Sequence, residues 1–71
     1  NKETLNVLDI GCGNGDYIKL LLKHNPNLKL TGVDFDTGVI SIAQSNLKQE
    51  LLDGKVKLIM CHFIFRYLNI K

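Results

Sequence analysis

The stretch Asp9-Ile10-Gly11-Cys12-Gly13-Asn14-Gly15 decides the fold of this 71-residue chain. It follows a short apolar run, residues 5–10 (LNVLDI), and precedes residues 16–24 (DYIKLLLKH), which have helical periodicity. A strand that runs into closely spaced glycines and then a helix brings bare backbone amides and the positive end of that helix to one edge of a sheet. The stretch therefore predicts a nucleotide-type binding loop.

The remaining sequence continues the alternation of strands and helices. Residues 29–35 (KLTGVDF) and 56–60 (VKLIM) predict two further strands. Between them Asp36 is a predicted N-cap, because its carboxylate can accept from the free amides of the next turn. Gly54 predicts the end of the helix that follows, since glycine tolerates a left-handed conformation. The buried stripe expected for this helix consists of Val39, Ile40, Ala43, Leu47 and Leu51.

The first predicted helix, residues 16–24, is expected to bury a wide apolar face. Asn25 and Pro26 should end it, because proline disfavours a helical conformation in the residue before it. The residues assigned to its apolar face are Tyr17, Ile18, Leu20, Leu21 and Leu22.

Strands that alternate with helices of about ten to fifteen residues imply parallel pairing through right-handed crossovers. We therefore predict an α/β fold: a Rossmann-like, partial doubly wound parallel sheet, βαβαβ, in strand order 3-2-1, truncated, with three layers. Residues 1–71 form one partial domain with its core at about 5–60. Residues 61–71 form an aromatic tail that could be an antiparallel edge strand or a short helix.

The glycine spacing separates two classes of ligand. Dinucleotide folds usually space their glycines G-x-G-x-x-G, whereas here Gly11, Gly13 and Gly15 alternate and Asp16 stands where the third glycine would fall. Asp9, two residues before the first glycine, would repel a pyrophosphate but would suit a ligand that carries an ammonium and a sulfonium. Both features argue against NAD.

A second acidic residue completes the predicted site. Asp34 stands at the end of the second predicted strand, where its carboxylate could accept from both hydroxyls of a ribose. Phe35 beside it could lie against an adenine ring. The two cysteines, Cys12 and Cys61, are expected to remain free thiols, and the histidines and cysteines lack the close spacing of a zinc site.

The segments VLDIGCGNG (residues 7–15) and TGVDFD (residues 31–36) resemble the first two motifs of the class I S-adenosylmethionine-dependent methyltransferases. The resemblance covers roughly residues 6–60, the cofactor-binding half of a family domain. It implies that Asp9 is oriented toward the methionine end of S-adenosylmethionine. It also implies that Asp34 holds the ribose hydroxyls and that Phe35 borders the adenine. The glycines that the resemblance places along the methionine and ribose are Gly11, Gly13 and Gly15.

Two departures from the family pattern limit the expected activity. Cys61 and His62 stand where many members have a Gly-Asp pair facing the adenine, and nothing corresponds to the fourth strand, which carries acceptor-side residues. We therefore expect these residues to bind the methyl donor without catalysing transfer alone. The alternatives are a non-catalytic interaction protein, which would tolerate loss of Asp34, and an NAD-binding fragment.

Composition gives the remaining expectations. Nine Lys/Arg against seven Asp/Glu give a net charge of +2, and the lysines are scattered, so nucleic-acid binding is not indicated. No apolar run approaches the roughly 20 residues of a membrane span, and two cysteines fit a reducing cytoplasm. The chain begins with Asn1 rather than methionine, which suggests an excerpt or a processed product. The first strand is expected to be an open edge that pairs with a second copy or a partner chain.

Overall fold

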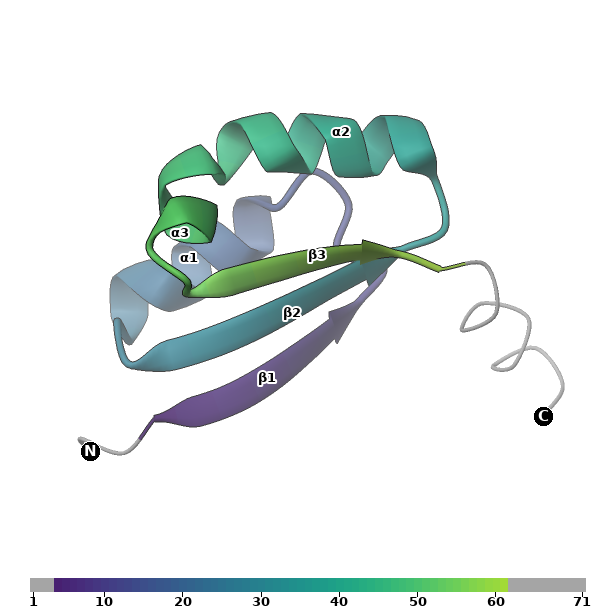
Figure 1. Ribbon diagram of the computed structural model, residues 1–71. Helices are drawn as coiled ribbons and strands as arrows, with labels where there is room; N and C mark the ends of the chain where they lie inside the picture. The colour runs from purple at the N-terminus through teal and green to yellow at the C-terminus, as the bar shows by residue number, and fades with distance from the viewer. Residues whose placement is uncertain (1–3, 62–71) are drawn as a thin grey trace, which may run out of the picture.

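The computed structural model describes residues 4–61 of the chain. It has three strands, with one helix between the first two and two helices between the second and third (Figure 1). In chain order they are β1 (Leu5–Ile10), α1 (Asp16–His24), β2 (Leu28–Asp34), α2 (Thr37–Asn46), α3 (Lys48–Leu52) and β3 (Val56–Met60). The bounds of β1, α1 and β3 agree with those predicted from the sequence, and β2 begins and ends one residue earlier.

The sheet has the predicted topology. β1 and β3 both pair with β2 in parallel, which gives the order β1-β2-β3. Asp9 lies opposite Gly32 in the register, and Asp34 lies opposite Met60. The carboxyl ends of the strands therefore meet at one edge, and this edge carries the glycine-rich loop. The predicted α/β, Rossmann-like partial sheet is confirmed.

The described helices cover one face of the sheet. Both connections step the same way across the sheet, so right-handed crossovers place their helices on the same side. The strand residues Leu28, Leu30 and Val56 are buried in the hydrophobic core together with residues of α1 and α2. Leu8 and Ile59, which point to the opposite face, remain exposed. The described residues thus form two layers rather than the three predicted.

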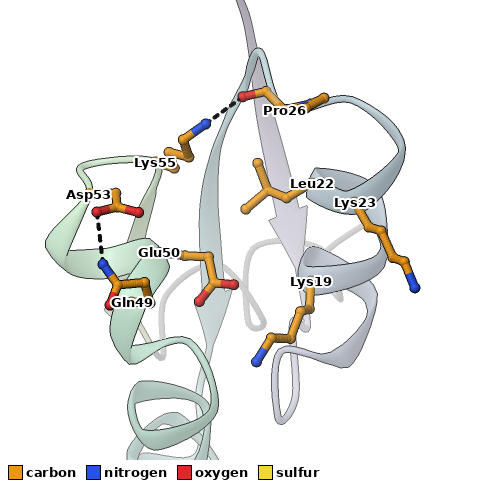
Figure 2. A pocket seen from close by; sticks show the side chains of 8 residues that line it. All are labelled: Lys19, Leu22, Lys23, Pro26, Gln49, Glu50, Asp53 and Lys55. Atoms are coloured by element: carbon orange, nitrogen blue, oxygen red, sulfur yellow. Dashed lines mark hydrogen bonds between the residues drawn. The ribbon is translucent and has the colours of Figure 1, made fainter.

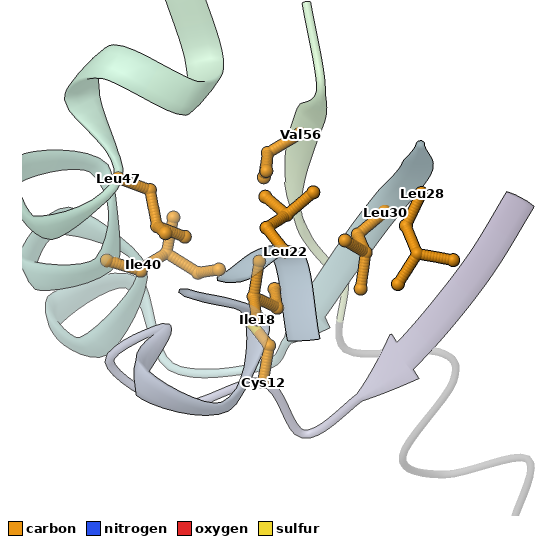
Figure 3. Packing of buried hydrophobic residues seen from close by; sticks show 9 residues of the cluster. Cys12, Ile18, Leu22, Leu28, Leu30, Ile40, Leu47 and Val56 are labelled. Atoms are coloured by element: carbon orange, nitrogen blue, oxygen red, sulfur yellow. The ribbon is translucent and has the colours of Figure 1, made fainter. Parts of the chain in front are cut away.

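The core lies between α1, α2 and the helix-covered face of the sheet (Figure 3). From α1 it receives Ile18 and Leu22, which are four residues apart and therefore lie on one side of the helix. Leu21 packs against the cluster from its edge. Tyr17 and Leu20 are exposed, so the prediction that they belong to the buried face was wrong. The nine-residue α1 packs on a sheet of only three strands. The sheet therefore covers a smaller part of this helix than its number of apolar residues suggests.

The predicted second helix is divided at Leu47. This residue has φ −108° and ψ 24°, outside regular helical geometry, and it separates α2 from α3. Its side chain is fully buried in the core. The predicted stripe residues Ile40, Ala43 and Leu47 are buried in the core. Leu51 packs against the core from α3, so the stripe does not lie on one continuous helix. The predicted cap is confirmed, because Asp36 accepts hydrogen bonds from two amides of the first turn of α2.

Among the described residues, β1 pairs with β2 alone and leaves its other edge open. Leu5, Leu8 and Ile10 of this strand are about half exposed. The expected partner contact at this edge stays a prediction, and the predicted aromatic tail beyond Cys61 lies outside the described residues. Within residues 4–61, every helix is too short or too polar to cross a bilayer.

Candidate cofactor-binding site

The glycine loop leaves β1 at the carboxyl edge of the sheet and remains tied to β2. The amides of Gly11 and Cys12 both donate to the carbonyl of Val33, at 2.7 and 3.0 Å. The amide of Gly15 donates to the carbonyl of Cys12 at 3.2 Å and closes the turn into α1. Backbone hydrogen bonds therefore fix both ends of the loop.

The three glycines of the loop have the same backbone handedness but different surroundings. Their φ values of 76°, 59° and 88° (Gly11, Gly13 and Gly15) all lie in the left-handed region, where side chains are disfavoured. A methyl group added to Gly11 or Gly13 would meet no atom within 4 Å. At Gly15 the same methyl group would lie 2.6 Å from Cδ1 of Leu47. Gly15 is thus required by packing, whereas Gly11 and Gly13 border open space.

Asp34 links the end of β2 to this loop. Its Oδ2 accepts from the amide of Gly13 at 3.0 Å, and its Oδ1 accepts from the amide of Asp36 at 3.1 Å. A carboxylate has about four acceptor positions, so each oxygen can still accept one more donor. The structure therefore brings the predicted Asp34 and the predicted loop into direct contact.

Asp9 differs from Asp34 in having no hydrogen-bond donor among residues 4–61. Its side chain is partly buried, and this burial raises the pKa of its carboxyl group. The unfolded chain does not impose that desolvation, so at neutral pH the charged carboxylate opposes folding. A partly buried anion without a donor is suited to a cationic group.

Cys12 fills the space beneath the loop. Its side chain is buried in the core, and a methyl group added to Gly32 of β2 would lie only 2.9 Å from its sulfur. Burial raises the pKa of the Cys12 thiol, and the negative charges of Asp34 and Asp9 raise it further. Both carboxylates therefore lie within electrostatic reach of the same sulfur atom. Cys12 is a packing residue with a suppressed thiolate, and both Cys12 and Cys61 are free.

Comparison with known proteins decides the family. The model of a family described as "Methyltransferase domain" matches residues 1–64. The chain belongs to this methyltransferase domain family. Malonyl-[acyl-carrier protein] O-methyltransferase of Acetivibrio thermocellus is 32% identical over 81 aligned positions, which cover 97% of this chain and 29% of that protein.

Solved structures agree with this assignment. The plantazolicin methyltransferase BamL, in complex with a triazolic desmethylPZN analog and SAH, has a TM-score of 0.63 and 34% identity. The alignment covers 79% of this methyltransferase domain and 19% of that chain. The pyocyanin biosynthetic protein PhzM has a TM-score of 0.76, with 86% of this chain and 18% of that chain covered. At 24% identity, its likeness concerns the fold alone. The domain thus spans less than a third of the length of each of these proteins.

Two residues of the methyltransferase domain that shape the loop were not singled out from the sequence. Gly32 is the position in β2 where the side chains of Ile18 and Cys12 approach the backbone, and a glycine within a strand is a known signal of such close approach. Asn46, at the end of α2, donates from Nδ2 to the carbonyl of Asn14 in the loop at 3.0 Å. No motif marks Asn46, because the contact depends on how α2 packs.

A pocket of about 370 Å³ lies between α1 and α3, away from the glycine loop (Figure 2). Among its lining residues, Lys55 directly precedes β3 and Pro26 stands two residues before β2, so the pocket is at the amino ends of those strands. Lys55 donates to the carbonyl of Pro26 at 2.8 Å, and Gln49 donates to Asp53 at 2.9 Å. This pocket is therefore distinct from the predicted cofactor site at the opposite edge of the methyltransferase domain.

Proposed function

We propose that this chain is the donor-binding part of an S-adenosylmethionine-dependent methyltransferase. The observation that carries the proposal is the backbone at Gly11 and Gly13, which has positive φ and borders space that a side chain would fill. Gly54 has the same positive φ and open surroundings, so this backbone conformation alone does not indicate a ligand. The open space at Gly11 and Gly13 differs in lying at the carboxyl edge of the sheet, where parallel α/β folds bind their ligands. Asp34 contacts the same loop through the amide of Gly13, so the acidic group lies beside that space.

The chemistry of the surrounding groups fits the donor. Asp34 retains one acceptor position on each oxygen and would hold the two ribose hydroxyls. Asp9, partly buried and without a hydrogen-bond donor among the described residues, would hold the ammonium of the methionine end. Phe35, about half exposed and adjacent to Asp34, would border the adenine. When bound, S-adenosylmethionine supplies a sulfonium-linked methyl group.

The acceptor side of the reaction is proposed to lie outside these residues. The chain spans 29% of the malonyl-[acyl-carrier protein] O-methyltransferase relative and 19% of BamL. The candidate groups at the carboxyl edge all belong to the donor side; they are Asp9, the glycine loop, Asp34 and Phe35. The 71 residues alone are therefore proposed to bind the donor without transferring its methyl group to an acceptor.

The test is a calorimetric titration of the chain with S-adenosylhomocysteine, the demethylated product. Wild type should show one saturable site, and Asp34→Asn should weaken binding by about 10- to 100-fold, because it removes a charged acceptor from the hydroxyls and from the loop. The matched control is Asp36→Asn, two residues away with the same change of charge. Asparagine caps helices as well as aspartate, so this control should bind like wild type.

Two outcomes would count against the proposal. If a folded wild-type chain shows no heat of binding, the loop holds no nucleoside, and the interaction-protein alternative becomes the better account. If NAD binds more tightly than S-adenosylhomocysteine, the dinucleotide alternative is correct.

The Asp9→Asn variant should separate the effect of the Asp9 charge on folding stability from its effect on donor binding. The folded chain holds the Asp9 proton more tightly than the unfolded chain, so the contribution of this carboxyl to stability is present at acid pH and lost as the pH rises through its raised pKa. The amide variant should therefore unfold at a higher urea concentration than wild type at pH 7. Its affinity for S-adenosylhomocysteine should nevertheless fall about tenfold or more, because the ammonium loses its counter-charge.

The pH dependence provides an independent check on Asp9. Wild-type affinity should fall at acid pH as the carboxyl takes up its proton, and the affinity of Asp9→Asn should fall by less over the same range. Parallel pH profiles for the two proteins would show that Asp9 does not hold the ammonium.

A further inference from the structure

The glycine loop is held from outside by the junction between α2 and α3. Asn46, the last residue of α2, donates from its side-chain amide to the carbonyl of Asn14 at 3.0 Å. Asn14 lies between two of the three loop glycines, 32 residues away in sequence. This hydrogen bond attaches the exposed outer side of the loop to a separate helix.

A second contact at the same junction packs under the loop. The break at Leu47 directs its fully buried side chain toward Gly15, where an added methyl group would lie 2.6 Å from Cδ1 and 3.0 Å from Cγ. Ala43, one turn earlier in α2, comes within 3.7 Å of the same position. The junction therefore touches the loop at two consecutive residues, Asn14 with a hydrogen bond and Gly15 with apolar packing.

Further hydrogen bonds join this junction to the start of α1. The ammonium of Lys19 donates to the backbone carbonyl of Asn46 at 2.8 Å. Asn14 accepts from the amide of Asp16 at 3.1 Å and donates to the carboxylate of Asp16 at the same distance. Loop, α1 and α2 are thus connected through Asn46 and Asn14.

We propose that Asn46 is a positioning residue for the donor site, acting with Leu47 to hold the glycine loop in the conformation that binds the donor. The inference rests on the proposed function, because the conformation at issue is the one that places Gly13 beside Asp34. Asn46 lies outside the candidate site itself, and its contact with the loop is with the carbonyl of Asn14. Donor affinity therefore depends on a side chain in a helix that follows the second motif.

The test uses two substitutions of Asn46 in the full 71-residue chain. Asn46→Asp keeps the shape but removes the hydrogen-bond donor, and Asn46→Gln keeps a carboxamide. Gln44→Glu, which makes the same change of charge at an exposed position of the same helix, is the matched control. The readouts are affinity for S-adenosylhomocysteine, the midpoint of urea unfolding, and amide hydrogen exchange at Gly13 and Gly15 without ligand.

Asn46→Asp should weaken binding about three- to tenfold and speed exchange of the two loop amides by a similar factor, as expected for one lost hydrogen bond. Exchange in β2 should stay as in wild type, which separates a loosened loop from a destabilised fold. Asn46→Gln should restore affinity to within about twofold of wild type, since its amide can still donate.

Loop exchange and affinity in Asn46→Asp equal to those of the Gln44→Glu control would overturn the inference. Faster exchange spread evenly over β2 and the loop would also overturn it, because Asn46 would then support only the global fold. If wild type itself fails to bind S-adenosylhomocysteine, the proposed function fails. The exchange comparison still decides whether Asn46 holds the loop.

Discussion

Replacing Gly15 with alanine is expected to leave most of the chain unfolded at room temperature. The new methyl group would lie 2.6 Å from Cδ1 and 3.0 Å from Cγ of Leu47, which is fully buried in the core, so Leu47 can shift only by disturbing the side chains packed around it. The backbone at Gly15 also has φ 88°, which disfavours any residue with a side chain. Overpacking and the left-handed conformation together should cost about 2–5 kcal/mol. A domain of this size rarely has more than about 3–5 kcal/mol of stability to lose.

The control for this variant is Gly54→Ala. Gly54 has φ 76°, but an added methyl group would meet no atom within 4 Å, so only the backbone strain of about 1–2 kcal/mol applies. Urea unfolding followed by circular dichroism should show a folded chain for Gly54→Ala and little or no folded baseline for Gly15→Ala. Equal midpoints for the two variants would show that Leu47 does not pack beneath the loop as described.

Gly13→Ala should give the opposite result, a folded chain that has lost its ligand. Nothing lies within 4 Å of a methyl group at Gly13, and its φ of 59° carries only the strain that Gly54→Ala also carries. Its unfolding midpoint should therefore match that of Gly54→Ala. The added methyl group would occupy the space proposed for the donor, and affinity for S-adenosylhomocysteine should fall about 100-fold.

Calorimetry on the same two variants measures this effect. Gly54 lies between α3 and β3, well separated in the chain from the loop, so Gly54→Ala should bind like wild type. If Gly13→Ala bound the ligand as tightly as Gly54→Ala, the open space beside Gly13 would not be part of the donor site.

Local sequence signals were sufficient where a residue's role depends on its neighbours in the chain. Asp36 caps α2 because its carboxylate reaches amides two and three residues ahead, and Gly54 follows α3 with φ 76°. The contact between Asp34 and the loop was also foreseeable in outline, since the carboxyl ends of adjacent parallel strands must meet.

Features that depend on packing between distant segments could not be predicted. The helix breaks at Leu47, although Leu51 still fits the four-residue spacing, and the buried Leu47 packs against Gly15. The same docking brings Asn46 to the loop. Tyr17 and Leu20 were misplaced because apolar composition shows which residues can be buried, but not how much surface the sheet offers.

An amide NMR titration of the chain with S-adenosylhomocysteine would show whether the glycine loop binds the donor. Saturable chemical-shift changes are expected at Gly11, Gly13 and the residues around Asp34, all at the carboxyl edge of the sheet. Shifts confined to the pocket between α1 and α3 that contains Lys19 and Lys55, or a well-dispersed spectrum that does not change, would contradict it.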